Sequence, residues 1–99
     1  MRRVLFIGDE ATAAGFRLAG AETACPAPDG TAEALAEARA RDDLGLILLG
    51  SMHAQALGRA AIAEAARAMD PPLTVVRDAA GAVRRPDLAR PVRDTLGLG

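Results

Sequence analysis

The side chains best suited to chemistry in this sequence follow two apolar runs. Asp9 and Glu10 come directly after the run 4–7, and Ser51 comes shortly after the run 44–49. If both runs are parallel strands, their carboxyl ends meet at one edge of a sheet, where ligands of such folds bind. Two carboxylates and a hydroxyl could there hold a metal ion or accept a phosphoryl group. The sequence therefore predicts that Asp9, Glu10 and Ser51 meet at this edge.

The partners that such chemistry needs are missing from the rest of the sequence. Response-regulator receiver domains, which resemble the fold expected here, need an Asp at the end of the third strand and a Lys at the end of a later one. Here the third expected strand, the run 44–49, is followed by Gly50 and Ser51 instead of an Asp, and the chain contains no Lys. Because acidic side chains at a helix start are stabilised by the helix dipole, Asp9 and Glu10 are expected to cap the helix or contact other surfaces.

No other motif completes a reactive site in the sequence. There is no GxxxxGK[ST] motif, and acids instead of glycines follow Gly8, so a nucleotide phosphate would be repelled. His53 lies near Ser51 without a GxSxG elbow, and we expect Ser-Met-His to cap a helix instead of forming a triad. Cys25 has no second thiol, and we expect it to be buried or inert. We therefore predict no catalytic residue, metal ligand or cofactor.

Composition indicates one small domain of 99 residues, with a sheet core over residues 1–82 and a last helix over residues 86–97. Hydrophobic residues make up 51% of the chain but aromatic residues only 2%, so the core must consist of aliphatic side chains and alanine. The net charge of −1 and the lack of Trp and Tyr argue against nucleic-acid binding. One cysteine, no leader and no long apolar run favour a cytoplasmic protein without membrane insertion.

Apolar runs that alternate with amphipathic segments predict four strands and four helices. The strands are expected over residues 4–7, 22–25, 44–49 and 73–76, with the second one at an edge because Pro26 and Pro28 follow it. The helices are expected after Asp9, over 31–42, over 52–69 and from Pro86. With right-handed crossovers, this order predicts a flavodoxin-like α/β fold: a parallel sheet of order 2-1-3-4 with helices on both faces.

Several residues are expected to fix the ends and faces of these helices. Thr12 or Asp9 is expected to cap the first helix and Thr31 the second, and Pro91 is expected to kink the last. The turn over 78–81 should follow the fourth strand. The apolar helix faces are predicted to contain Phe16, Leu18 and Ala19, then Ala32, Leu35, Ala36 and Ala38, then Leu57, Ala61, Ile62, Ala65 and Met69, and finally Leu88, Val92 and Leu96.

The stretch 7–20, IGDEATAAGFRLAG, resembles the N-terminal signature of the F subunit of the rotary V-type and A-type ATPases. In that signature a strand ending in IGDE is followed by T, then by G-F, then by L-A-G. The later sequence has the same order of elements, from the apolar LGLILL strand to a terminal helix ending in L-G. The resemblance covers essentially the whole chain and is specific over residues 7–20, with departures at Ala11, Ala13 and Pro91.

The resemblance implies a non-catalytic part of a rotary motor, in the cytoplasm at the membrane periphery. In that family the F subunit and the helical shaft, the D subunit, dock together and form the central stalk inside the ring of A and B subunits, where ATP is hydrolysed or made. The chain would couple or regulate ion transport, with the C-terminal helix as a candidate mobile element that reaches A and B. The interface candidates are Asp9, Glu10, Phe16, Arg17, Arg84, Arg85, Arg90, Val92, Arg93 and Leu96.

One alternative stays open on the sequence alone. A stand-alone flavodoxin-like module for ligand sensing or signalling would have the same fold, and it would bind a small molecule near Asp9 and Ser51. The charge distribution does not decide between the two functions. Residues 1–50 have a net charge of −3 and residues 51–99 one of +2, which suits docking between oppositely charged partners but also an ordinary solvated surface.

Overall fold

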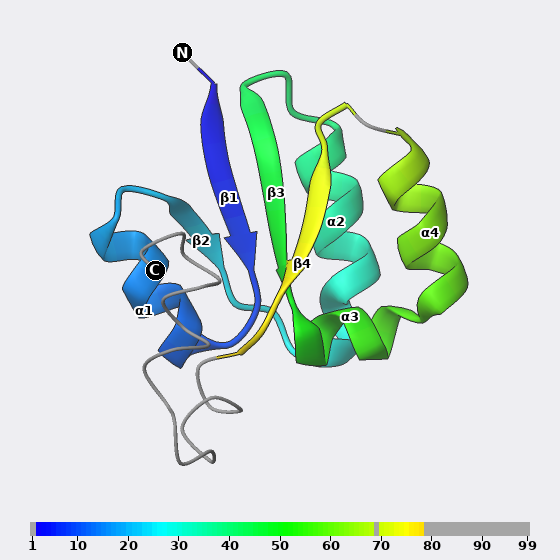
Figure 1. The fold of residues 1–99 in the computed structure, drawn as a ribbon, viewed down its shortest axis with the longest axis horizontal. Coiled ribbons are helices and arrows are strands. Elements are labelled where there is room, and N and C mark those ends of the chain that lie inside the picture. Colours follow the sequence, from blue (N-terminus) through cyan, green and yellow to red (C-terminus); the bar gives the residue numbers. More distant parts are fainter. Residues whose placement is uncertain (1, 69, 79–99) are drawn as a thin grey trace.

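A parallel sheet of four strands forms the centre of the chain (Figure 1). The computed structural model describes residues 2–68 and 70–78. The strands are β1 (Arg3–Ile7), β2 (Glu22–Ala24), β3 (Leu44–Gly50) and β4 (Leu73–Val76), in the order β2-β1-β3-β4. The predicted flavodoxin-like α/β class, the strand order and the edge position of the second strand are confirmed.

Helices cover both faces of this sheet. One face carries α1 (Glu10–Leu18), and the other carries α2 (Thr31–Arg39), α3 (Ser51–Leu57) and α4 (Arg59–Ala68). A short 3₁₀ turn, η1 (Pro28–Gly30), precedes α2. Figure 1 shows α1 beside β2 on one side, and α2 and α4 on the other side beyond β4.

The core consists of two layers separated by the sheet. Leu5 and Ile7 of β1 pack against α2, α3 and α4, whereas Phe6 between them packs against α1. Successive side chains of a strand point to opposite faces, so a strand covered on both faces needs an unbroken apolar run. This is why the runs 4–7 and 44–49 lack the alternation of a half-exposed strand. Ile47 and Leu49 of β3 are fully buried.

The start of α1 is as predicted, but its buried face is not. Asp9 is the N-cap, and its carboxylate accepts a hydrogen bond from the backbone N–H of Thr12. Leu18, expected on the apolar face, is 92% exposed. At about 100° per residue, it lies about 200° around the helix from the buried Phe16. The buried residues of α1 are Thr12, Ala13 and Phe16.

The prediction of a continuous helix over 52–69 is wrong, because the helix is interrupted at Gly58. This glycine has φ 98° and ψ 151°, and it ends α3 before α4 begins at Arg59. The break changes the phase of the apolar stripe. Ile62 and Ala65 still pack on the sheet, but Ala61 is exposed. Met69 lies outside the described residues.

The predictions for α2 also need correction. Thr31 lies inside the helix, where its hydroxyl donates a hydrogen bond to the Pro28 carbonyl at 2.6 Å, and Gly30 is the N-cap. The helix ends at Arg39 instead of at residue 42, because Arg41 turns to bind Glu22 and Asp43. The buried residues of α2 are Thr31, Leu35 and Ala38, whereas Ala32 and Ala36 are exposed. Most of the expected turn over 78–81 and all of the last helix from Pro86, with Leu88, Pro91, Val92 and Leu96, lie outside the described residues.

Candidate functional site at the carboxyl edge of the sheet

The carboxyl ends of β1, β3 and β4 bring three polar side chains together. The backbone N–H of Asp78 donates to the hydroxyl of Ser51 at 3.4 Å. The carboxylate of Asp78 accepts from the backbone N–H of Met52 through Oδ2 at 3.1 Å. The carboxyl groups of Asp9 and Asp78 lie close enough for each to shift the pKa of the other. Asp78 therefore connects the start of α1 with the start of α3.

Two glycines allow this close approach. A Cβ added to Gly50 would lie 2.6 Å from Oδ1 of Asp78 and 3.3 Å from the Cα of Gly8. Any side chain at position 50 would therefore push the Asp78 carboxylate away or separate the ends of β1 and β3. The glycines that end both apolar runs are needed for packing at this edge, because a backbone without Cβ can approach its neighbours closely.

Burial and hydrogen bonding move the pKa values of the two carboxyl groups in opposite directions. Burial raises the pKa of Asp78, and the charge of Asp9 raises it further, against the hydrogen bond from Met52. Burial also acts to raise the pKa of Asp9, but hydrogen bonds from Thr12 and Asp78 outweigh it and hold that pKa below its usual range. In such a pair the more buried group keeps its proton more readily.

Glu10, predicted to meet Asp9 and Ser51, points elsewhere. It accepts a hydrogen bond from Arg17 at 3.0 Å on the exposed side of α1. Arg17 also donates to the hydroxyl of Thr23 at 2.9 Å and so ties α1 to β2. The hydrogen bond from Arg17, with a second one from Cys25, lowers the pKa of Glu10. The prediction is therefore wrong for Glu10, because bonding along one helix face holds it away from the edge.

Asp78, and not Glu10, is the second carboxyl group that lies beside Asp9 and Ser51. The signal for it was present, since Asp78 follows the fourth strand just as Asp9 follows the first. Parallel strands end at the same edge, so an acidic residue after β4 must lie near the residues that follow β1 and β3. The interpretation of Asp78 as a turn residue left this out.

His53 and Ser51 do not form a catalytic pair. The ring Nε2 of His53 donates to the carbonyl of Pro26 at 2.7 Å, and the ring is 97% buried under η1. The hydroxyl of Ser51 accepts from the backbone of Asp78 instead. Neither side chain caps α3, contrary to the prediction. The carboxylate of Asp78 instead accepts from the backbone N–H of Met52 in the first turn of this helix.

Cys25 was expected to be buried or inert, and of these two alternatives burial is wrong, because the residue is exposed. Partial burial of its sulfur, with the hydrogen bond to Glu10 and the charge of Glu10, nevertheless raises the pKa of the thiol. A raised pKa leaves little thiolate, the reactive form, at neutral pH. This thiol is therefore accessible but weakly reactive.

Of the remaining predicted interface residues, two lie in the described part of the chain and six lie outside it. Phe16 is buried, and its ring stacks on that of Phe6 in β1 with a centroid distance of 4.8 Å. This contact attaches α1 to the sheet. Arg17 is half exposed on the outer side of the same helix. Six residues lie outside the described part of the chain: Arg84, Arg85, Arg90, Val92, Arg93 and Leu96.

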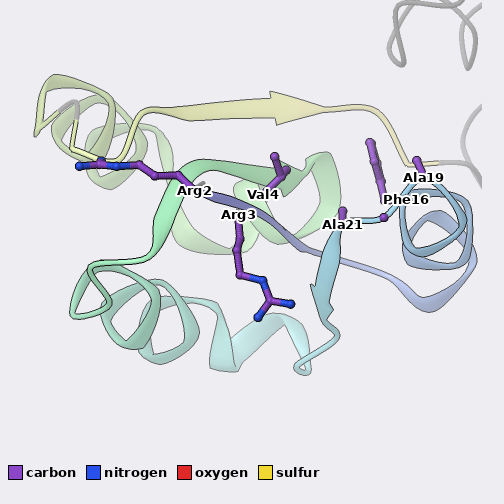
Figure 2. Close-up of a pocket in the computed structure, with 7 residues that line it drawn as sticks. Arg2, Arg3, Val4, Phe16, Ala19 and Ala21 are labelled. Atoms are coloured by element: carbon purple, nitrogen blue, oxygen red, sulfur yellow. The ribbon is translucent and has the colours of Figure 1, made fainter.

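An open groove of about 540 Å³ lies away from this edge, at the amino end of β1 beside the end of α1 (Figure 2). Arg2 and Arg3 line it, but Figure 2 shows their side chains extending in different directions. Each pairs with an acid elsewhere, Arg2 with Asp70 at 3.6 Å and Arg3 with Glu22 at 3.3 Å. The two cations therefore do not converge on a common anion.

The described residues contain neither a cluster of metal ligands nor a membrane-spanning helix. Over residues 2–68 and 70–78, no group of three or more His, Cys, Asp and Glu side chains could hold a metal ion. Within the same ranges, no helix has the length and apolar character needed to cross a membrane.

Comparison with known protein families gives one match. The model of the family described as ATP synthase (F/14-kDa) subunit matches residues 4–85, which is most of the chain. No curated protein matches the chain. The matched range includes the signature stretch 7–20, β1 from its second residue, the whole of β2, β3 and β4, and Asp78.

Proposed function

The chain belongs to the family of the ATP synthase (F/14-kDa) subunit of the V/A-type enzymes, and on this premise we propose that it is a non-catalytic part of the central stalk. The observation that carries the proposal is the family match over residues 4–85. In this function the chain docks on the helical shaft, the D subunit, and couples or regulates ATP turnover and ion transport. ATP is hydrolysed or made by the A and B subunits, which the C-terminal segment contacts.

The geometry of the carboxyl edge supports a binding part better than an enzyme. Asp9 caps α1, Asp78 binds the start of α3, and Ser51 accepts from the backbone of Asp78. Each of these side chains holds strand ends and helix starts together. Asp78 also fills the position beside Ser51 and Asp9 where a stand-alone sensing module would bind its ligand.

The outer side of α1 is the docking surface that we propose for the shaft. Leu18 is 92% exposed at the end of this helix, next to the ion pair of Arg17 with Glu10. An exposed leucine alone is ordinary on a soluble protein. Beside a charged pair, however, it combines an apolar contact with the polar rim that protein interfaces use. Phe16 and Asp9 contribute indirectly, because they hold α1 in place.

Co-expression with the helical shaft tests this function. We expect the two chains to elute together in gel filtration at micromolar concentration, and separate elution would exclude the stalk assignment. The variant Leu18→Asp should weaken the complex, whereas Ala66→Asp, on an exposed position of α4 across the sheet, should leave it intact. Titration of the isolated chain with ATP in a calorimeter should show no binding, and saturable micromolar binding would contradict the proposal.

A further inference from the structure

We propose that Asp9 and Asp78 share a single proton, and that this protonated pair fastens the end of β4 to the ends of β1 and β3. The inference does not depend on the stalk function. It concerns Asp78, the residue directly before the segment 79–99. The contact that holds this residue on the sheet would therefore depend on a proton.

The unpartnered oxygens of the two carboxyl groups carry the proposal. Oδ2 of Asp9 accepts from Thr12, and Oδ2 of Asp78 accepts from Met52. The second oxygen of each group, Oδ1, is buried and has no hydrogen-bond partner. Because an ionised carboxylate can only accept, two ionised groups in contact would leave both oxygens unsatisfied and repel each other. One proton between the side chains gives both groups a partner.

Burial of the pair favours a shared proton as the way to satisfy both carboxyl groups. Asp78 is 5% exposed, so bulk water does not reach its carboxyl group freely. Gly50 also approaches closely, since a Cβ there would lie 2.6 Å from Oδ1 of Asp78, so no side chain at position 50 can lie beside this oxygen. Two like charges in such surroundings cannot both remain ionised near neutral pH without a large cost.

Among residues 2–68 and 70–78, the other titratable groups around the pair do not neutralise it. His53 lies close enough for a charge on its ring to lower the pKa of Asp78. Its Nε2 donates to the carbonyl of Pro26 and its buried Nδ1 has no hydrogen-bond partner, so the ring donates no hydrogen bond to either carboxyl group. Glu10 of α1 and Cys25, directly after β2, are further acids near Asp9, and Arg17 is paired with Glu10. Arg77, next to Asp78 in sequence, is exposed.

The stabilisation by the Asp9–Asp78 pair decreases as the pH rises. Burial, with the charge of Asp9, raises the pKa of Asp78, so the folded chain keeps a proton that the unfolded chain has already lost. A group with a raised folded pKa stabilises the fold below its unfolded pKa, and this contribution disappears as the pH passes the folded pKa. Above that pH both carboxylates are charged, and their repulsion acts on Asp78, two residues after β4, where it binds the start of α3.

The test is a carbon-detected NMR titration of the side-chain carboxyl groups in the full chain. We expect the pair to titrate in two separate steps, one below and one above the usual range of an aspartic acid. The variant Asp78→Asn should remove the upper step, because its amide can donate to Asp9 permanently while its carbonyl accepts from Met52. Asp29→Asn, at an exposed position in η1, is the matched control and should leave both steps in place.

Urea unfolding against pH gives a second readout. Between the unfolded and folded pKa values of Asp78, the unfolding equilibrium constant of the unmodified chain should rise by about tenfold for each pH unit, relative to Asp78→Asn. If Asp78→Asn fails to fold, Asp9→Asn replaces it, because an Asn amide still caps a helix and donates to Asp78. One overlapping titration step at ordinary pKa values, or an upper step that survives either substitution, would overturn the proposal.

Discussion

Replacing Gly58 with alanine should destabilise the chain, whereas the same replacement at Gly15 should stabilise it. Gly58 has φ 98° and ψ 151°, a region that essentially only glycine occupies, and forcing another residue into it costs about 1–3 kcal/mol. A Cβ at position 58 would meet nothing within 4 Å, so the whole effect comes from the backbone. Gly15 lies inside α1 with equally open surroundings, and alanine there should gain about 0.5–1 kcal/mol.

The two variants should therefore differ from each other by about 1.5–4 kcal/mol in the free energy of unfolding. Urea unfolding of the full chain, followed by far-UV circular dichroism, measures this difference. The slope against urea should stay unchanged, because neither methyl group alters the surface exposed on unfolding. If the Gly58→Ala variant were as stable as the unmodified chain, this would refute the interruption of the helix at Gly58. It would mean that residues 51–68 form the continuous helix that their apolar spacing favours.

Two further predictions concern surface charges. Hydrogen bonds from Arg41 hold the pKa of Glu22 low, so this pair stabilises the fold above the unfolded pKa of Glu22, and the contribution is lost as the pH falls. Arg41→Gln should therefore flatten the acid side of the stability profile in urea unfolding at low salt, and an unchanged profile would contradict this. Glu10→Gln should speed alkylation of Cys25 near neutral pH, because the hydrogen bond and charge of Glu10 raise the thiol pKa. An unaltered pH–rate profile for iodoacetamide would exclude that contact.

The helix ends and faces were predicted less well than the strands, for a physical reason. A strand buried on both faces needs a continuous apolar run, which has few other interpretations in a short chain. Alanine-rich helices give a weak periodic signal, because alanine fits buried and exposed positions alike. The exposed Leu18 and Ala61 and the break at Gly58 all fall in such segments.

The sequence by itself determined the fold class, the strand order and the family, through the apolar runs and the stretch 7–20. It did not determine which carboxyl groups meet. The parallel register that pairs Gly50 with Val76 brings Asp78 to Ser51 and Asp9, residues far from it in the chain. Bonding to Arg17 turns Glu10 away, although it adjoins Asp9 in sequence. Tertiary structure decided this pairing, because contact and burial depend on how strand ends align and not on sequence separation.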